Sequence, residues 1–593
     1  MALSRAPSLL SPVAILLAAL LGVTLVLTPS CSQRPIDPTT QTTQTQWTLS
    51  APLPTGHMLL EIWGISRNDI WAVGDMASLV HYDGSTWTAI DTRFDADFTG
   101  VWGRASDDVY AAGEDGYTDG GIVIHYDGSN WQWVDTGHGR IYYDVWGYED
   151  SVFVAGELIV VEDNNGWSLS FEPPEFIRGL WGTSAHDVFA VGDNGIILHF
   201  DGQTWSPMDS PTSNYLYGVW GYAHDDVYAA GSYGTLLHYN GIAWEPMNSG
   251  TGWRLYDIWG NASGDVYVVG SGGTIRLLEG TTWERQESGT VFGLTGIWGD
   301  VDGEMFVVGR FGKVLHNNGA GWAAMSSGSG VDLSDVWGDA PDNYVAVGDY
   351  GVIYRYDGAL WQEEPLLYSN FFYGVWGANR DDVFIVGERG LVLRSEDSEW
   401  VFSGRPVDTD LWGVWGTSSQ NVYAVGDSGK ITRFDGTQWE EIAHDFGGDY
   451  WDVWGSSAND VFVVGTRGTI LHYDGESWAQ MGSGTSSTLL SIWGDAPDMV
   501  FAVGQSGTIL YYNGSGWRPM GGGGDRTFVG VWGSSFDDVY APSFEGDILH
   551  FDGVQWTTTL VDDNSSFRAI CGSSATDIFA VGVLGRILHF GGQ

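Results

Sequence analysis

The dipeptide Trp-Gly recurs along most of the chain at a fixed spacing. From Trp181 onward every step is 39 residues, and Cys571-Gly572 continues the frame 39 residues after Trp532. The tryptophans of this series are Trp63, Trp102, Trp146, Trp181, Trp220, Trp259, Trp298, Trp337, Trp376, Trp415, Trp454, Trp493 and Trp532. With Cys571 they define fourteen units that fill the chain from Trp47 to Gln593, so one repeated structural unit has to account for the fold.

Each unit contains four short stretches with the composition of β-strands. In the unit WGSSANDVFVVGTRGTILHYDGESWAQM, which begins at Trp454, β-branched and aromatic residues gather before Trp-Gly, in DVFVVG and in GTILHY, and a fourth stretch begins at Trp478. Turn residues separate these stretches, and none is long enough for a helix. Four short strands in about 40 residues, repeated many times, are typical of β-propeller blades. A β-solenoid, the alternative, usually has a shorter period.

The two ends of the chain complement each other. A second tryptophan recurs in each of the first thirteen units, at Trp87, Trp131, Trp167, Trp205, Trp244, Trp283, Trp322, Trp361, Trp400, Trp439, Trp478, Trp517 and Trp556. The fourteenth unit ends before this position, and Trp47 supplies it from the other end of the chain. An N-terminal strand that completes the last blade closes a propeller and removes a free sheet edge, which a solenoid does not require.

The number of units bears on the domain organisation. Because propellers usually have about four to eight blades, fourteen four-stranded blades predict two seven-bladed rings, residues 47–316 and 317–593. No linker or change in composition marks this joint. A single larger ring and an uneven division therefore remain open alternatives.

Acidic residues occupy two recurrent positions. One lies in the motif Tyr-Asp-Gly-x-x-Trp, as in Tyr473-Asp474-Gly475, where Asp and Gly suit a tight turn between strands. The other lies six residues after the Trp of Trp-Gly, where it opens a strand and its carboxylate can accept hydrogen bonds from neighbouring backbone N–H groups. We interpret both positions as structural. No unit has the dense Asp-x-Asp-x-Asp-Gly spacing of a calcium loop, so we expect no metal site.

The turn motif resembles the Asp box of BNR and sialidase-type propellers. Across all fourteen units the chain resembles the WD40, kelch and BNR-like propeller superfamily. Asp boxes in these propellers are structural turns remote from the active site. The resemblance therefore implies a propeller fold and no catalytic residue.

Familiar enzyme motifs are absent from the sequence. There is no Gly-x-Ser-x-Gly elbow, His-Glu-x-x-His motif or phosphate-binding Gly-x-x-x-x-Gly-Lys-Ser/Thr. One strand position repeatedly holds histidine, and we interpret these histidines as strand residues rather than general bases or metal ligands. They are His81, His125, His199, His238, His316, His472, His550 and His589. We predict no catalytic residue and no cofactor, with a propeller glycoside hydrolase or polysaccharide lyase as the alternative because carboxylates are abundant.

Aromatic residues stand three positions before the Trp of Trp-Gly in six units. They are Tyr143, Tyr217, Tyr256, Tyr373, Trp412 and Trp451. Aromatic faces that carry a polar atom suit sugar rings and peptide side chains. We predict that these residues form a ligand-binding face for a protein or carbohydrate, and packing between blades is the alternative role.

The N-terminus has the features of a secretory signal. Arg5 precedes an uncharged apolar run, residues 13–27, and small residues follow up to Cys31. This arrangement resembles the bacterial lipoprotein signal, which implies a signal peptide over residues 1–30 and lipid attachment at Cys31. Residues 31–46 are rich in Pro, Thr and Gln and are predicted to form a flexible linker.

The charge of the chain restricts its partners. A net charge of -51 repels nucleic acid and anionic lipid headgroups, so contact with a membrane is expected through the lipid anchor alone. From the lipoprotein-like N-terminus, the closed repeat and the absence of enzyme motifs, we predict an extracytoplasmic binding module, lipid-anchored in the cell envelope, on a bacterial outer membrane or cell surface. An envelope structural or assembly factor is a further alternative.

Overall fold

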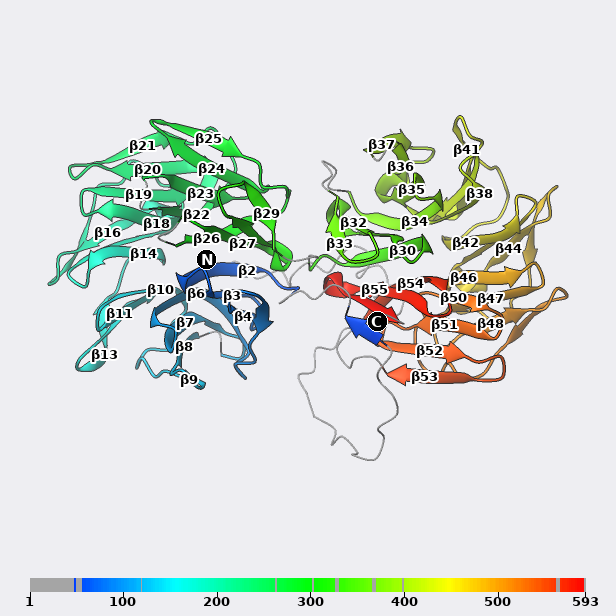
Figure 1. Ribbon diagram of the computed structural model, residues 1–593, viewed down its shortest axis with the longest axis horizontal. Helices are drawn as coiled ribbons and strands as arrows, with labels where there is room; N and C mark the ends of the chain where they lie inside the picture. Colours follow the sequence, from blue (N-terminus) through cyan, green and yellow to red (C-terminus); the bar gives the residue numbers. More distant parts are fainter. Residues whose placement is uncertain are drawn as a thin grey trace, which may run out of the picture. The chain divides into compact units, whose positions relative to one another are not determined.

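The structure, a computed structural model, describes residues 47–49, 56–118, 120–261, 264–300, 303–325, 330–364, 370–396, 399–560 and 566–590. This part of the chain forms fourteen four-stranded antiparallel sheets joined by turns, as the repeat predicts (Figure 1). Its only helical elements are single 3-10 turns such as η7 (Thr466–Gly468). None of the described helices is long and apolar enough to cross a membrane. Cys31 and the predicted signal peptide lie outside the described residues.

One sheet illustrates how the repeat folds. β42 (Tyr450–Ser457), β43 (Asp460–Gly465), β44 (Ile470–Tyr473) and β45 (Trp478–Met481) pair in chain order. The second strand, VFVVG, is almost fully buried, because both faces of each sheet pack against neighbouring sheets. The fourth strand is largely exposed and correspondingly polar. Burial of β-branched and aromatic side chains between successive sheets is therefore the main source of stability.

The chain divides into two compact units. The first unit is Leu53–Gly330, and the second is Val331–Gln593 together with the N-terminal strand β1 (Trp47–Leu49). The first strands of the seven sheets in the first unit are β2 (Leu59–Ser66), β6 (Ala96–Ala105), β10 (Tyr142–Tyr148), β14 (Ile177–Ser184), β18 (Leu216–Ala223), β22 (Leu255–Gly260) and β26 (Leu294–Gly299). Those of the second unit are β30 (Leu333–Ala340), β34 (Phe372–Asn379), β38 (Leu411–Ser418), β42, β46 (Leu489–Ala496), β50 (Trp532–Ser535) and β54 (Phe567–Ser574).

These first strands contact one another in a cyclic order within each unit. Each strand contacts the next one along the chain, and the last returns to the first: β26 contacts β2, and β54 contacts β30. The sequence placed the limit between the two rings at residues 316 and 317, within β28 (Val314–Asn317). β28 pairs with β29 (Trp322–Ala324) in the last sheet of the first unit, and the units divide after Gly330.

The N-terminal strand completes the sheet at the C-terminal end of the chain, as predicted. β1 pairs antiparallel with β56 (Ile587–Phe590), with Trp47 opposite Phe590 (Figure 1). The last sheet therefore has the order β1-β56-β55-β54, in which β55 spans Asp577–Gly582. Because β1 hydrogen-bonds to β56, β56 is not left as a free sheet edge.

The Trp-Gly dipeptide joins each sheet to the next. The indole ring of Trp220 lies so close to the following Gly260 that a Cβ on this glycine would be 2.4 Å from the ring. The same contact joins Trp298 of the last sheet of the first unit to Gly64 of its first sheet. Glycine is therefore required because a tryptophan from the preceding sheet occupies the space that a side chain would take.

Cys571 is the one exception in the Trp-Gly series. Its side chain is partly buried, and Gly338, which should receive a tryptophan from the fourteenth unit, instead lies against the ring of Tyr344. Tyr344 also packs edge-on against Phe579 at a ring distance of 4.6 Å. A tyrosine from the eighth unit thus fills the space left by the shorter cysteine.

The two recurrent acidic positions have different roles. At Asp474 the backbone N–H groups of Glu476 and Ser477 donate to one carboxylate oxygen, and these hydrogen bonds hold its pKa below the usual range. This confirms the predicted turn. At the second position, however, Asp460 accepts hydrogen bonds from Ser456 Oγ and from His472 Nε2 at 2.6 Å, rather than from backbone N–H groups.

The pairing of an acidic residue with a strand histidine repeats in eight sheets. The pairs are Asp69–His81, Asp108–His125, Asp187–His199, Asp226–His238, Glu304–His316, Asp460–His472, Asp538–His550 and Asp577–His589. Seven of the pairs are twelve residues apart in sequence. The histidines are strand residues, as predicted, and each ring is oriented by a carboxylate.

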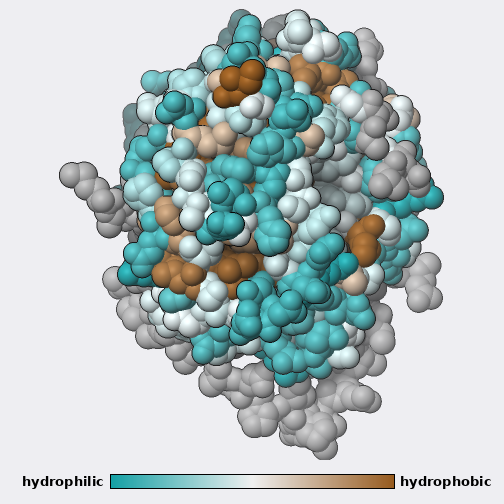
Figure 2. Space-filling model, turned by 90° about the vertical axis from the view of Figure 1, so that its left-hand side faces the viewer, coloured by the Kyte–Doolittle hydropathy of each residue, from teal (hydrophilic) through white to brown (hydrophobic). Residues whose placement is uncertain are grey.

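Several large hydrophobic side chains lie on the surface, among them Tyr233, Trp253 and Ile242. The face shown in Figure 2 is mainly hydrophilic and carries small, separate hydrophobic patches. The most exposed hydrophobic side chains are single residues such as Ile242 and Val554, which lie in the turns before the second tryptophan. Single exposed hydrophobic side chains are ordinary on a protein surface and do not by themselves mark a binding site.

Candidate functional site

Three of the predicted aromatic residues form one continuous cluster in the second unit. Tyr373 on β34 stacks on Trp412 on β38 with 4.2 Å between ring centroids, and Trp412 lies 4.7 Å from Trp451 on β42. Leu490 on β46 extends the row. These four residues occupy the same position in successive sheets, so the repeat itself brings them side by side. We call Tyr373, Trp412, Trp451 and Leu490 the aromatic row.

The aromatic row lines a cavity of about 200 Å³. All seven sheets of the second unit contribute to the lining, through residues that precede the Trp-Gly position. Val529, Arg568, Asp335 and Asp452 also line the cavity, and Val529 packs against the aromatic row. The cavity therefore lies where the first strands of this unit converge.

Two hydrogen-bond donors at this cavity have no acceptor. Trp412 Nε1 donates to Asp427 Oδ1 at 2.8 Å, whereas the Nε1 of Trp451 is buried and has no partner. The Nη1 of Arg568 is likewise buried without a partner. An unpaired buried donor is costly, so each group would be stabilised by an acceptor that a small side-chain movement brings within reach. Nine other tryptophan Nε1 atoms among the described residues are unpaired in the same way, and what distinguishes Trp451 and Arg568 is that both residues line the cavity.

Arg568 is an unusually buried cation. Only 5% of its side chain is exposed, its Nη2 is 3.9 Å from a carboxylate oxygen of Asp332, and its guanidinium lies 4.9 Å from the ring centre of Phe544. Burial lowers the pKa of Arg568, against the opposing effect of Asp332 and Asp349. At 3.9 Å the contact with Asp332 is a charge interaction and not a good hydrogen bond, which leaves the guanidinium incompletely satisfied.

Two partly buried carboxylates, those of Asp335 and Asp452, tie neighbouring sheets together at the cavity. Asp335 accepts hydrogen bonds from the backbone N–H groups of Val336 in its own sheet and Val375 in the next, each at 2.8 Å. Burial, together with the charge of Asp452, raises the pKa of Asp335 to about 7. Burial likewise raises the pKa of Asp452 to about 6, although backbone N–H groups and the hydroxyl of Ser491 donate to it.

The other three predicted residues lie in the first unit and are arranged differently. The ring centroids of Tyr217 and Tyr256 are 5.8 Å apart. Tyr143 is separated from these two tyrosines in the strand order by Arg178, and the guanidinium of Arg178 lies 3.9 Å from the ring centre of Tyr143. Arg178 in turn makes two hydrogen bonds, of 2.8 and 3.0 Å, to Asp193. The polar groups here are thus paired with one another.

The predicted face is therefore two groups of three residues, one in each unit. The ligand-binding role of all six remains a prediction. Sequence reasoning did not single out Arg568, Asp335 or Asp452 as site residues. The sequence does contain a signal for the two carboxylates. Asp335 and Asp452 each lie two residues before the Trp of Trp-Gly, and the next unit has a small residue, Gly374 or Ser491, at the same position.

The fold can be compared with known structures. Neither a protein family nor a curated protein matches the chain in sequence. Among solved structures, the GH74 xyloglucanase of Xanthomonas campestris aligns at 12% identity over 92% of this chain and 99% of its own, with a TM-score of 0.58. The GH74 enzyme of Niastella koreensis gives the same identity and coverage and a TM-score of 0.57.

A third similar structure is PorZ, a bacterial surface component of the type-IX secretion system of Porphyromonas gingivalis. It aligns at 11% identity over 92% of this chain and 86% of its own, with a TM-score of 0.51. Together with the fourteen four-stranded sheets, these likenesses show that the chain has a β-propeller fold. At such low identities they concern the fold alone.

Proposed function

We propose that this protein is an extracytoplasmic β-propeller that binds a glycan or protein ligand in the cavity of its second unit, and that Cys31 anchors it to the cell envelope through a lipid. The observation that carries the binding role is the aromatic row beside two buried, unpaired donors. Each unit is, in this proposal, a separate seven-bladed ring, which the cyclic order of strand contacts supports.

The chemistry of the cavity favours a carbohydrate. Flat indole and phenol rings pack against the C–H faces of sugars, and sugar oxygens can accept hydrogen bonds from Trp451 Nε1 and Arg568 Nη1. A peptide side chain that offers an apolar face and an acceptor would satisfy the same groups. The cavity volume of about 200 Å³ suits one ring or one side chain rather than a long segment.

The binding role is tested with glycan arrays and pull-downs of envelope proteins. The variant Trp412→Ala with Trp451→Ala is expected to lose binding, whereas Trp133→Ala, which removes an exposed tryptophan in the first unit, retains it. Because the first two residues are buried, Trp451→Phe is compared as well: it keeps an aromatic ring and removes the indole N–H together with the five-membered ring. Binding that survives in both aromatic-row variants contradicts the proposal.

Lipid attachment has its own test. The wild-type protein should partition into the detergent phase of a Triton X-114 extraction, and Cys31→Ala should move it to the aqueous phase. A Cys31→Ala protein that stays in the detergent phase rules out the anchor.

A glycoside hydrolase is the second candidate, because Asp335 and Asp452 are carboxylates with raised pKa values at a cavity. GH74 enzymes among the similar structures agree with this candidate only in fold. Against it, both oxygens of Asp335 are held by backbone N–H groups, which gives this residue a structural role. Release of reducing sugar from a polysaccharide panel that is lost in Asp335→Asn would favour the enzyme.

A further inference from the structure

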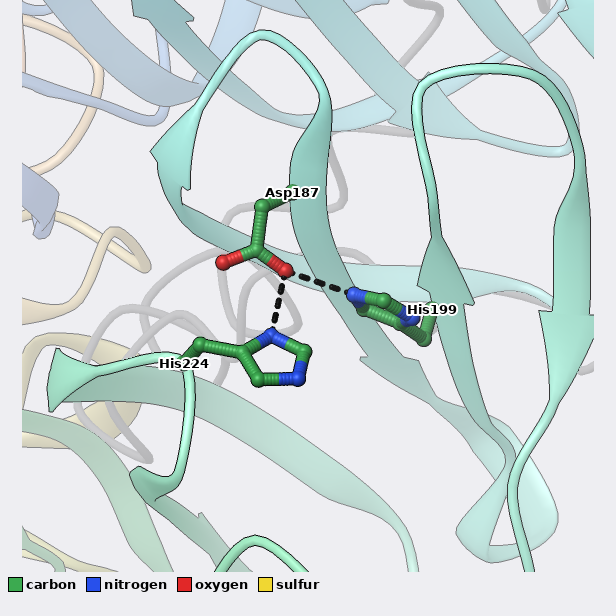
Figure 3. A group of neighbouring side chains, drawn as sticks. All are labelled: Asp187, His199 and His224. Atoms are coloured by element: carbon green, nitrogen blue, oxygen red, sulfur yellow. Dashed lines mark hydrogen bonds and ion pairs between the residues drawn. The ribbon is translucent and has the colours of Figure 1, made fainter.

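One carboxylate in the first unit faces two histidines instead of one. Asp187 opens β15 (Asp187–Gly192), His199 lies on the neighbouring β16 (Ile197–Phe200), and His224 lies in the turn before β19 (Asp226–Gly231) of the next sheet. His199 Nε2 is 2.6 Å and His224 Nδ1 is 2.7 Å from the same oxygen, Oδ1 of Asp187 (Figure 3). The three side chains converge from two adjacent sheets.

The surroundings of this cluster hold its side chains in place. The hydroxyl of Thr183 donates to Asp187 Oδ2, which leaves Oδ1 to the histidines. The ring of Phe189 lies 4.7 Å from that of His199 and 5.8 Å from that of His224. Three hydrogen-bonding side chains thus converge on the Asp187 carboxylate.

The repeat explains the Asp187–His199 pair but not His224. In the first sheet, Arg67 occupies the turn position that His224 occupies here. Its Nη1 lies 2.9 Å from Glu304 of the preceding sheet in the cyclic order. Glu304 also pairs with the strand histidine His316. That arrangement is an ion pair between sheets. His224 differs because a neutral imidazole has a lone pair that an arginine lacks, and it is the group that can bind a metal ion.

We propose that Asp187, His199 and His224 form a binding site for a divalent transition-metal ion, with Zn²⁺ as the first choice. Two imidazole nitrogens and one carboxylate oxygen are a ligand set that Zn²⁺ accepts. Among the residues that the structure describes, these three are the one such group whose ligand atoms all lie within 4.8 Å of each other.

Metal binding requires only a small rearrangement. With ligand bonds of about 2.0–2.2 Å in a tetrahedral site, neighbouring ligand atoms lie roughly 3.3–3.6 Å apart, so the present contacts of 2.6 and 2.7 Å would lengthen by about 0.6–1 Å. His224 has 57% of its side chain exposed and sits in a turn, so it can make this movement. Its exposure also leaves the remaining coordination positions open to water or to a donor from another molecule.

Zinc titration of the full, untagged protein after chelator dialysis tests the site, by calorimetry or by competition with a chromophoric chelator. We expect one Zn²⁺ per chain, and a loss of affinity of at least about 100-fold in His224→Ala. The matched control is His238→Ala, which breaks the corresponding pair with Asp226 one sheet further along and should leave zinc binding unchanged.

A gain-of-site variant makes the test sharper. Ser106 occupies the turn position equivalent to His224 and lines the same cavity as Asp69 and His81. Ser106→His should therefore raise the stoichiometry from one to two Zn²⁺ per chain. Wild-type protein that takes up no zinc at about 100 μM, or equal binding by His224→Ala and the wild type, overturns the proposal. Circular dichroism of each variant confirms that the change lies in the site and not in the fold.

Discussion

Tyr344 donates a 2.6 Å hydrogen bond to the carboxylate of Asp577, which lies 233 residues later in the chain. Its hydroxyl also accepts a 2.7 Å hydrogen bond from the backbone N–H of Ser573. The first sheet of the second unit is thereby joined to the last, at the point where Cys571 replaces the tryptophan of the other units. A tyrosine that is unusual in its own unit thus compensates for a cysteine that is unusual in another.

This compensation predicts that the two positions are coupled. Cys571→Trp should overfill the space beside Tyr344 and cost about 1–3 kcal/mol, and Tyr344→Val should leave a cavity costing about 2–4 kcal/mol. The double variant restores the tryptophan of the other units, so its cost should be at least about 1 kcal/mol below the sum of the two. Urea unfolding of the second unit measures the three values. If the costs of the two single variants add to that of the double variant within about 0.5 kcal/mol, the proposed compensation between Tyr344 and Cys571 is contradicted. As a control, Tyr344→Phe keeps the ring and should not rescue Cys571→Trp.

The contact between Trp220 and Gly260 predicts a strong local effect of one methyl group. Gly260→Ala would place its Cβ 2.4 Å from the indole ring, so the unfolding free energy of the first unit should fall by about 1–3 kcal/mol. Gly252→Ala is the control, because nothing lies within 4 Å of the corresponding Cβ. Equal melting temperatures for the two variants would show that the indole can move aside.

The raised pKa values at the cavity predict that the second unit loses stability as the pH rises. The pKa values of Asp335 and Asp452 are about 7 and 6 in the folded protein, against about 4 when unfolded. Between pH 4 and pH 7 the folded state therefore binds more protons at these two carboxyl groups than the unfolded state does. Their contribution to the unfolding free energy is largest below pH 4 and falls as the pH rises towards 7.

Urea unfolding from pH 5 to pH 8 measures this dependence. Asp335→Ser, which installs the residue type found at the equivalent Ser491, should flatten the slope of the second unit. Asp357→Ser should not, because hydrogen bonds from Leu360 and Ala359 hold the pKa of Asp357 below its usual value, outside this window. A slope unchanged in Asp335→Ser would assign the pH dependence to other groups.

The pairing of β1 with β56 predicts that removal of residues up to 52 destabilises the second unit alone. The deletion exposes the backbone edge of β56 and removes one of the four strands of the last sheet. Calorimetry should show a lowered melting temperature for the transition of the second unit, with that of the first unit unchanged. Assignment of the transitions by limited proteolysis completes the test, and a shift of both transitions would contradict it.

The repeat made a large part of the fold predictable. Trp454, Asp474 and Trp478 recur at fixed spacing, and their spacing alone indicated the strands, the turns and the complement between Trp47 and the last unit. The role of the second acidic position was wrong in part, because the partner of Asp460 is His472 on the next strand. Spacing of twelve residues does not reveal that contact until the register of the two strands is known.

The candidate sites were less predictable. The equivalent positions of Tyr373, Trp412 and Trp451 follow from the repeat, but their stacking in one unit and the separation of Tyr143 by Arg178 in the other depend on which sheets adjoin. Likewise, the nitrogen of His224 meets Asp187 only because successive sheets bring a turn of one against a strand of the other.

The sequence by itself determined the blade: its four strands, its Asp turns and the strand that completes the last sheet. These features depend on local periodicity and on contacts repeated in every unit. Only the tertiary structure decided how single departures from the repeat combine, as in Tyr344 with Cys571, the buried Arg568 near the aromatic row, and His224 with Asp187. Such partners come from different sheets, and their contacts depend on packing distances that no spacing along the chain encodes.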